Sequence, residues 1–263
     1  MKQEIVLDKS YLQGASAGSI HSLCATFRVI MPGALFFELL TGDPVERARC
    51  FAKFPQVMNP VEIVEHVGRL LRFEASKKKP APPLYERRHR MLFNFNTKLT
   101  DSTFVPTPEQ QKGIGSWEKE VEREVDSFRE RVALSHRWFP SIESASNRDR
   151  PGVIKEIQAL VARDPKLVRK LYSSIRTKFF PRSAQLDSRW AFFRWMQVHV
   201  IGALDHVSRY GVGSDLTGAR NLENEVVDLQ YRIMGVLAGA IATRDKKCQE
   251  VFQMLRPDGL LVC

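Results

Sequence analysis

The chain has 263 residues, of which 43% are hydrophobic and 27% are charged. These fractions are typical of a globular protein that buries a core, and they exclude a largely disordered chain. The 40 Lys and Arg residues outnumber the 30 Asp and Glu residues, which gives a formal net charge of +10. A positive charge of this size attracts polyanions, so nucleic acid is the leading candidate partner, while the alternative is that the charge serves only solubility.

The sequence also indicates where the protein works. The first ten residues, MKQEIVLDKS, lack the basic start and long apolar run of a secretory signal, and no stretch of the sequence is apolar for long enough to span a bilayer. The four cysteines are scattered, without the close pairs of zinc or redox motifs. We therefore expect a reduced, cytoplasmic protein that does not interact with a membrane.

Short apolar runs alternate with helical patterns in the first part of the chain. Residues 4–7 and 28–31 predict buried strands. A turn is expected at residues 14–18, and helical patterns follow at residues 19–27, 34–40, from Asp43 onward, and 61–73. These patterns do not locate a third strand in this part of the chain.

The last part of the chain returns to the same alternation. The patterns predict a helix at 225–240, a strand at 240–243, a helix at 246–255 and a strand at 260–262. Between the two parts, the segment Lys-Lys-Lys-Pro-Ala-Pro-Pro at 77–83 predicts an exposed linker. Helical spacing then dominates, at residues 117–136, 151–180 and 185–210. We therefore expect a core formed by residues 1–73 and 212–263, with residues 74–211 as a helical insertion that begins with this basic, Pro-rich linker.

The alternation of strands and helices predicts an α/β fold, with one parallel sheet assembled from both ends of the chain and helices on both faces. Ligands of such sheets bind beyond the carboxyl ends of the strands. Asp8 and Asp245 each follow a predicted strand, and Glu38 lies on the helix after the second strand. We expect these three carboxylates to face the same crevice.

Four acidic segments resemble, in the same order, the four acidic motifs of PIN-domain nucleases. They are Ile5-Val-Leu-Asp-Lys-Ser-Tyr-Leu12, Phe36-Phe-Glu-Leu-Leu40, Asn224-Glu-Val-Val-Asp-Leu-Gln-Tyr231 and Ala242-Thr-Arg-Asp245. The resemblance covers the two terminal parts of the chain and implies a PIN-like parallel sheet flanked by helices, interrupted here by the large helical insertion. It further implies that Asp8, Glu38, Asp228 and Asp245 are catalytic, metal-binding residues, with Thr243 in a supporting role.

The chemistry of such a cluster can be argued without the resemblance. Crowded carboxylates repel one another unless cations neutralise them, and Mg²⁺ or Mn²⁺ prefers these oxygen ligands. A water made more acidic by the metal can attack a backbone phosphorus in line. Glu225 lies about one helical turn before Asp228 and is a further candidate ligand, and Ser10 is a candidate hydrogen-bond donor to the cluster. We expect a metal-dependent endoribonuclease with a role as a toxin, in antiviral defence or in RNA processing.

Each acid also has a structural explanation. Asp8 could cap a turn, Asp245 and Thr243 could each cap a helix, and Glu38 and Asp228 could be surface residues. The order of the set favours catalysis over these separate explanations. Two other functions stay open: a DNA or flap nuclease with the same centre, and a catalytically inactive module that binds nucleic acid or protein.

The middle of the chain supplies candidate contacts with phosphate groups. These basic residues are Lys77, Lys78, Lys79, Arg87, Arg88 and Arg90, followed by Lys166, Arg169, Lys170, Arg176, Lys178 and Arg182. The aromatic residues of this part are expected in a helical core rather than stacked on bases, namely Phe179, Phe180, Trp190, Phe192, Phe193 and Trp195. The insertion could instead bind a protein regulator or a second copy of the chain.

A second kind of ribonuclease centre is also compatible with the sequence. Arg131 and His136 have the spacing of the Arg and His pair in HEPN-type ribonucleases, which are helical and do not depend on metal. An Arg and a His at such a spacing often occur together by chance, so this centre is the lesser alternative.

Overall fold

The computed structural model describes residues 2–57, 59–64, 66–84, 97–211 and 219–263. It divides into two compact units. The first, here called the sheet unit, comprises Met1–His66, Pro82–Glu120 and Met234–Cys263, and the second, the helical unit, comprises Val67–Ala81 and Val121–Ile233. These bounds differ from the expected segments 1–73, 74–211 and 212–263, because the helix after residue 66 packs against the helices of the middle section.

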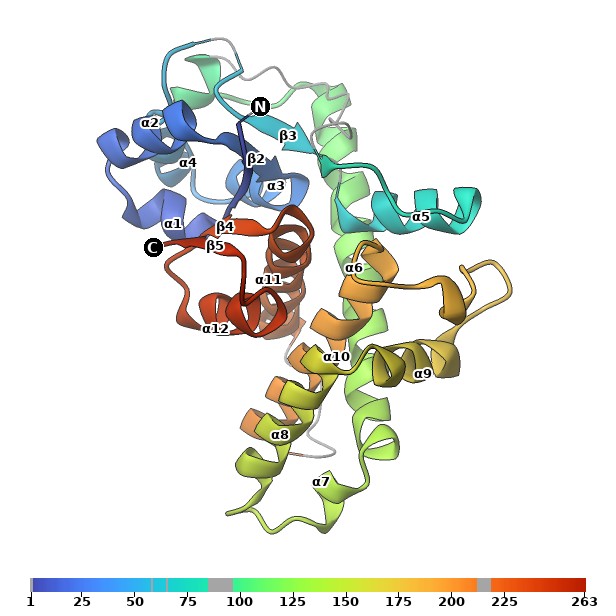
Figure 1. The fold of residues 1–263 in the computed structure, drawn as a ribbon. Coiled ribbons are helices and arrows are strands. Elements are labelled where there is room, and N and C mark those ends of the chain that lie inside the picture. Colours follow the sequence, from blue (N-terminus) through green and yellow to red (C-terminus); the bar gives the residue numbers. More distant parts are fainter. Residues whose placement is uncertain (1, 58, 65, 85–96, 212–218) are drawn as a thin grey trace. The chain divides into compact units, whose positions relative to one another are not determined.

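The sheet unit is built on a five-stranded parallel sheet with the strand order β3-β2-β1-β4-β5 (Figure 1). The strands are β1 (Glu4–Leu7), β2 (Arg28–Pro32), β3 (Glu62–Val64), β4 (Ala240–Ala242) and β5 (Leu260–Val262). Two of the five come from the last part of the chain. This arrangement confirms the expected α/β class, with a parallel sheet assembled from both ends and a long helical middle section.

Strand β1 occupies the centre of the sheet, and its residues Ile5, Val6 and Leu7 are fully buried. Leu7 pairs with Ala242 of the neighbouring strand β4. The backbone amide of Asp8 continues this ladder by donating to the Ala242 carbonyl at 3.0 Å. Because parallel strands end at the same edge of a sheet, the residues that follow β1 and β4 are neighbours there.

Short helices flank this sheet. They are α1 (Lys9–Gly14), α2 (Ala17–Thr26), α3 (Gly33–Thr41), α4 (Pro44–Phe51), the 3₁₀ helix η2 (Thr97–Thr100) and α12 (Lys246–Leu255). In Figure 1, α2, α3 and α4 gather on the side of β2, while α12 lies beside β4 and β5. The sequence analysis missed helix α1 and predicted only a turn at residues 14–18. A helix of six residues is too short to show a periodic pattern of apolar residues.

Strand β3 was missed by the sequence analysis, which read residues 61–73 as one helix. In the structure Glu62–Val64 pair with β2, and α5 (Val67–Lys77) begins only afterwards. The apolar residues Val61, Val64 and Val67 recur at a helical interval, so a strand of three residues is hidden within an apparently helical pattern.

Two glycines shape the connection from α11 (Ala219–Ala238) into β4. Gly239 ends the helix with φ of 76°, in the left-handed region that favours glycine. A Cβ atom at Gly235 would lie 2.9 Å from Cδ1 of Ile241, so the absent side chain allows close packing of the last helical turn on β4. This connection sets where β4 starts and therefore where it ends.

The helical unit is arranged around α10 (Ala191–Tyr210), whose residues 191–207 are all buried. Helix α10 packs against α5, α8 (Arg150–Arg163) and α9 (Pro165–Ile175). The remaining helices are α6 (Pro108–Trp138) and α11, which both cross the boundary of the units, α7 (Ser141–Ser144) and the 3₁₀ helix η3 (Ser183–Gln185). Within the described ranges, no helix is long and apolar enough to cross a membrane.

The expected helix at residues 151–180 is in fact two helices. Asp164 accepts a hydrogen bond from the Lys166 amide at 2.8 Å and caps α9, and Pro165 lacks the amide hydrogen that would continue α8. Most aromatic residues of this part lie in the core as expected, including Trp190, Phe192, Phe193 and Trp195. Phe180 is half-buried, and Phe179 has 69% of its surface exposed.

A buried carboxylate fixes the start of α10. Glu74 of α5 has no exposed surface, and its Oε1 accepts hydrogen bonds from the amides of Ala191 at 2.7 Å and Ala81 at 2.9 Å. Its Oε2 accepts from the Phe192 amide at 2.9 Å. The first amides of a helix have no partner within the helix, so Glu74 satisfies two of them and binds α5 to α10.

We predict that Glu74→Ala lowers the free energy of unfolding by about 2–4 kcal/mol, because two buried amides and the part-buried Ala81 amide lose their acceptor. Glu74→Gln, which keeps one carbonyl oxygen, should cause a smaller loss. Chemical denaturation monitored by circular dichroism measures both values. Glu156→Ala, at an exposed position of α8, serves as the control and should change stability little. Equal stability of the Glu74→Ala and Glu156→Ala variants would contradict this role.

Candidate carboxylate site

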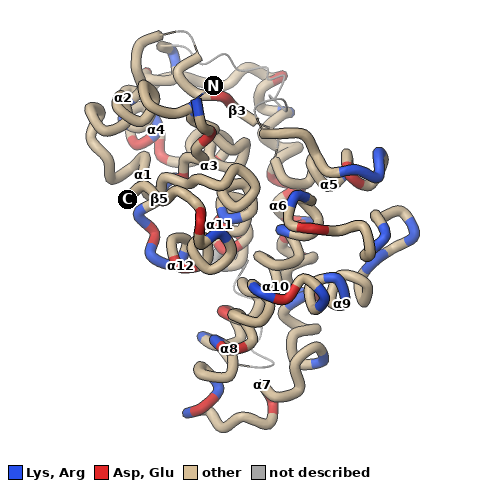
Figure 2. Tube along the Cα trace, in the orientation of Figure 1, with Lys and Arg blue, Asp and Glu red and all other residues tan. Residues whose placement is uncertain are grey.

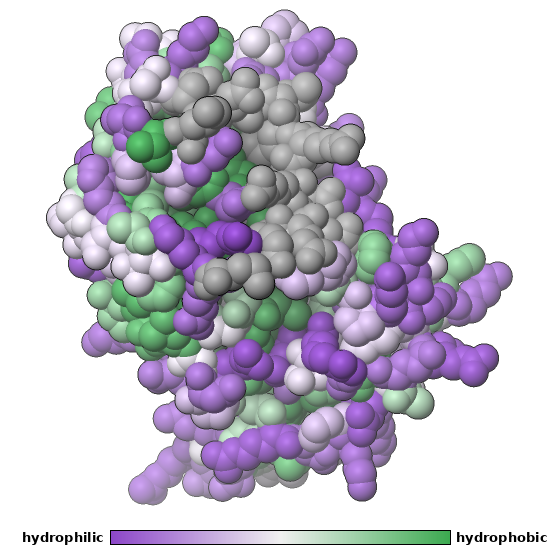
Figure 3. Space-filling model, turned by 45° about the horizontal axis from the view of Figure 1, so that its top comes forward, coloured by the Kyte–Doolittle hydropathy of each residue, from purple (hydrophilic) through white to green (hydrophobic). Residues whose placement is uncertain are grey.

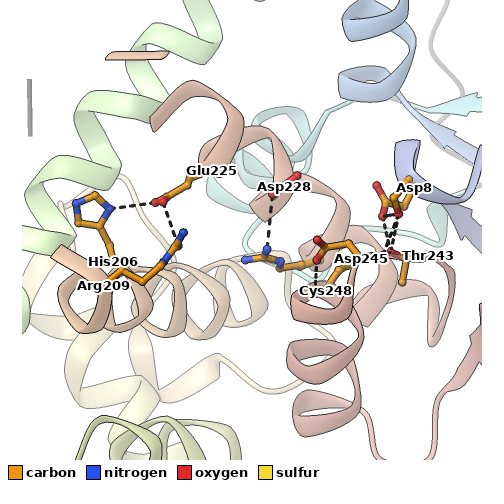
Figure 4. Close-up of polar contacts among 10 residues, drawn as sticks. Asp8, His206, Arg209, Glu225, Asp228, Thr243, Asp245 and Cys248 are labelled. Carbon is orange, nitrogen blue, oxygen red and sulfur yellow. Dashed lines mark hydrogen bonds and ion pairs between the residues drawn. The ribbon is translucent and has the colours of Figure 1, made fainter. Parts of the chain in front are cut away.

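Asp8 is the most buried acid of the candidate site. It follows β1 directly, stands at the N-cap position of α1 and has 5% of its surface exposed. Its Oδ2 accepts a hydrogen bond from Ser10 Oγ at 2.7 Å and another from Thr243 Oγ1 (Figure 4). Both hydroxyl groups therefore hold the same carboxylate oxygen, and they come from the segments that follow β1 and β4.

The same two hydroxyl groups also position Asp245. The Asp245 amide donates to Thr243 Oγ1 and to Ser10 Oγ, each at 3.1 Å. The Arg244 amide donates to Ser10 Oγ at 2.9 Å. Ser10 and Thr243 thus donate their hydroxyl hydrogens to one acid and accept amide hydrogens from the segment that carries the other, which fixes the two acids relative to each other.

Asp245 is exposed, in contrast to Asp8, and it caps α12. Its Oδ1 accepts a hydrogen bond from the Cys248 amide at 2.5 Å (Figure 4). The structural explanation for Asp245, that it caps a helix, is therefore correct, but it does not exclude a second role. Capping uses one carboxylate oxygen, and a carboxylate has a second oxygen that can accept other ligands.

The surroundings of Asp8 disfavour its charged form. Burial raises the pKa of Asp8 above its usual value, and the nearby negative charge of Asp245 raises it further. The hydrogen bonds from Thr243 and Ser10 stabilise the carboxylate and oppose this increase in the pKa. Two negative groups held together in this way attract a cation, because a positive charge relieves both the repulsion and the burial.

Glu38 lies on α3 in the sheet unit and forms an ion pair with a residue that the sequence analysis overlooked. Lys9 Nζ donates to Glu38 Oε1 at 2.8 Å, and both side chains are partly exposed. Lys9 follows Asp8 directly in the chain, and its ammonium group contacts Glu38. The position of Lys9 within the first acidic motif could have drawn attention to it, but a sequence does not show which acid a lysine contacts.

Glu225 and Asp228 lie on α11 in the helical unit. Glu225 Oε2 is 3.1 Å from His206 Nδ1, and its Oε1 is 3.0 Å from Arg209 Nη2 (Figure 4). Asp228 is half-exposed, and its Oδ2 is 3.7 Å from Arg232 Nη2 one turn later in the helix. Glu225 thus acts as a structural ion-pair partner that binds α11 to α10, while Asp228 keeps an accessible carboxylate.

The donor set of the sheet unit fits a divalent cation that retains water ligands. Mg²⁺ typically binds through one or two carboxylates and keeps several waters. Asp8 and Asp245 provide two such groups. Among the side chains that the structure describes, no three His, Cys, Asp or Glu residues are grouped as ligands of one metal ion. The two aspartates, completed by water, are therefore the arrangement that the described residues support.

The other candidate residues have different surroundings. Lys77, Lys78 and Lys79 are exposed at the end of α5 in the helical unit, whereas Arg87, Arg88 and Arg90 lie outside the described residues. Arg131 is buried: its Nη1 donates to the Ser127 carbonyl at 2.6 Å, and its guanidinium lies 4.8 Å from the centre of the Trp195 ring. Such an arginine serves packing, so the HEPN-type alternative with His136 gains no support.

Comparisons with known proteins add no further information. No protein-family model, no curated protein and no solved structure matches this chain.

The raised pKa of Asp8 predicts how stability depends on pH. Folding favours protonated Asp8, so its contribution to stability is present below the pKa of the unfolded chain and is lost as the pH rises through the higher pKa of the folded chain. Charged Asp8 is then destabilising at neutral pH. We predict that Asp8→Asn raises the free energy of unfolding by about 1 kcal/mol at pH 7, and that this gain disappears near pH 3.

Denaturant titrations at several pH values measure this difference. Asp43→Asn is the matched control, because Asp43, like Asp8, stands at the N-cap position of a helix of the sheet unit, where its side chain accepts a hydrogen bond from the Glu46 amide at 2.8 Å. Asn is as good an N-cap as Asp, so the control should change stability little. An Asp8→Asn variant that is less stable than the wild type at pH 7 would contradict the assignment.

Proposed function

We propose that this protein is a Mg²⁺- or Mn²⁺-dependent endoribonuclease that hydrolyses phosphodiester bonds at the Asp8 and Asp245 carboxylates. The observation that carries the proposal is the hydroxyl network of Ser10 and Thr243, which holds two acids together at the carboxyl edge of a parallel sheet. The resemblance to PIN-domain nucleases supports the same residues, and the net charge of +10 suits a polyanionic substrate.

The side chains of the site have separate tasks in this proposal. Ser10 and Thr243 orient the Asp8 carboxylate through Oδ2, and the Cys248 amide orients the Asp245 carboxylate through Oδ1. The two aspartates hold the cation in a fixed place at the sheet edge. When bound, a divalent cation supplies an acidified water as nucleophile and neutralises negative charge on the reacting phosphate.

Lys9 supports a site for a single cation. Its ammonium group already compensates Glu38 at 2.8 Å, so Glu38 adds no net negative charge to the site while this ion pair is formed. In this proposal Lys9, the residue after Asp8 in the chain, also provides a positive charge for a substrate phosphate. We therefore assign the cation to Asp8 and Asp245, and we assign to Lys9 the role that a second cation has in two-metal centres.

Several expectations stay predictions. A role for Asp228 as a further metal ligand rests on its position in the third of the four acidic segments. Binding of a protein regulator, or of a second copy of the chain, through the helical part is also a prediction. The cytoplasmic location is likewise part of the proposal. Both RNA and DNA carry the phosphodiester that such a centre attacks, so the tests of activity include both kinds of oligonucleotide.

We predict that Asp8→Asn combined with Asp245→Asn abolishes cleavage of a single-stranded RNA in Mn²⁺ and leaves RNA binding intact, because Asn keeps the hydrogen bonds but loses the charge that holds the cation. Wild-type protein should also gain thermal stability on addition of Mn²⁺, and the double variant should not. Gel-based cleavage assays and thermal unfolding measure the two effects.

Asp43→Asn again provides the control and should cleave like the wild type. Unchanged cleavage by the double variant would reject the proposed centre. If the wild type binds RNA but neither cleaves RNA or DNA nor gains stability with Mn²⁺, the chain is instead the catalytically inactive binding module.

The assignment of Lys9 makes a separate prediction. Lys9→Met removes the positive charge of the residue that follows Asp8, so Mn²⁺ should bind about three- to tenfold more tightly. Isothermal titration calorimetry measures this affinity. Lys112→Met, at an exposed lysine of the same unit, should leave it unchanged. Equal Mn²⁺ affinities of the Lys9→Met variant and the wild type would remove Lys9 from the site.

A further inference from the structure

The loop that follows α9 exposes a phenylalanine while its neighbour is anchored. The Phe180 ring packs 4.8 Å from the Phe192 ring and stacks on Tyr172 at 6.4 Å. The Tyr172 hydroxyl donates to the Pro181 carbonyl at 3.1 Å, which holds the loop against the helical unit. Phe179 lies just before these anchors, and its side chain is 69% exposed. The ring is thus presented to solvent from a fixed backbone.

Two lysines border this exposed ring. Lys178 Nζ lies 5.1 Å from the centre of the Phe179 ring, and Lys78 Nζ donates to the Phe179 carbonyl at 2.5 Å. Lys78 has φ of 54°, in a region where glycine or asparagine is usually found after a helix. Lys78 occupies this strained backbone position, and its side chain reaches the Phe179 segment. The hydrogen bond thus links the end of α5 to this loop.

The surrounding residues are positively charged. The loop contributes Arg176, Lys178 and Arg182, the end of α5 contributes Lys77, Lys78 and Lys79, and all six are exposed. Residues 75–82 and 171–186 contain no Asp or Glu. Figure 2 shows Lys and Arg gathered on these segments, and Figure 3 shows hydrophilic side chains projecting along the same edge. We call this group of six basic residues and Phe179 the Phe179 surface.

We propose that the Phe179 surface binds single-stranded RNA, with the Phe179 ring stacked on a base and the basic residues in contact with the flanking phosphates. Unpaired bases stack on exposed aromatic rings, whereas duplex RNA keeps its bases stacked on one another. A membrane surface fits less well, because insertion depends on apolar area from several residues and this loop exposes one large apolar side chain. The choice of RNA over other anionic polymers rests on the proposed function.

Binding of a fluorescein-labelled 12-nucleotide oligouridylate, followed by fluorescence anisotropy in EDTA, tests this proposal without cleavage. Phe179→Ala should weaken binding about 5- to 100-fold, because stacking on one base is lost. Phe179→Trp should bind at least as well as the wild type, and Phe179→Leu should bind like Phe179→Ala. Tyr210→Ala is the matched control: this tyrosine of the same unit is 49% exposed and lies beside Arg209, and its loss should change nothing.

The charges are tested by salt dependence. Replacing Lys78 and Lys178 with Gln should reduce the slope of log affinity against log salt concentration by about 1.4, because two phosphate contacts to a single strand are removed. The proposal fails if Phe179→Ala binds the oligouridylate like the wild type. It also fails if Phe179→Leu binds like Phe179→Trp, or if Phe179→Ala loses affinity only for phosphatidylserine vesicles. Because no metal is present, each result is independent of whether the carboxylate site cleaves RNA.

Discussion

Two hydroxyl groups connect the ends of neighbouring strands and fix the candidate centre. Ser10 and Thr243 both donate to one oxygen of Asp8 and both accept the Asp245 amide. Two of these four hydrogen bonds, from Thr243 to Asp8 and from the Asp245 amide to Ser10, join the first and last parts of the chain. The network stabilises a buried carboxylate whose pKa is nevertheless raised by burial and by Asp245. Acids whose pKa is shifted by burial and by a neighbouring charge cluster at functional sites, which favours a function for this pair.

Much of the fold could be predicted from the sequence, because strands β1 and β2 are apolar runs with clear ends and the last strand follows a Pro-Asp-Gly turn. The parallel direction of the strands followed from the alternation of strands and helices. Strand β3 could not be predicted, since three residues carry no period that distinguishes a strand from a helix. The division into units also escaped prediction, because α5 packs against α10, and Glu74 joins the two helices over a sequence separation of 117 residues.

The candidate site was predictable to a different degree. Asp8 and Asp245 could be placed at one edge because each follows a strand of the same parallel sheet. The partners of the acids could not be predicted: Lys9 forms an ion pair with Glu38, and Glu225 contacts Arg209 and His206. Side-chain pairs of this kind depend on helix positions in space. The exposure of Phe179 also could not be predicted. The sequence analysis expected this ring in the helical core, whereas in the structure Phe180 is anchored and Phe179 is exposed.

The central claim is that two aspartates from opposite ends of the chain bind one cation. A crystal soaked in Mn²⁺, with diffraction data collected at the manganese absorption edge, tests it most directly. The account predicts one anomalous peak within roughly 2.0–2.3 Å of a carboxylate oxygen of both Asp8 and Asp245, with water as the remaining ligands. A soaked crystal with no peak at these carboxylates, or with manganese bound only elsewhere, would contradict it.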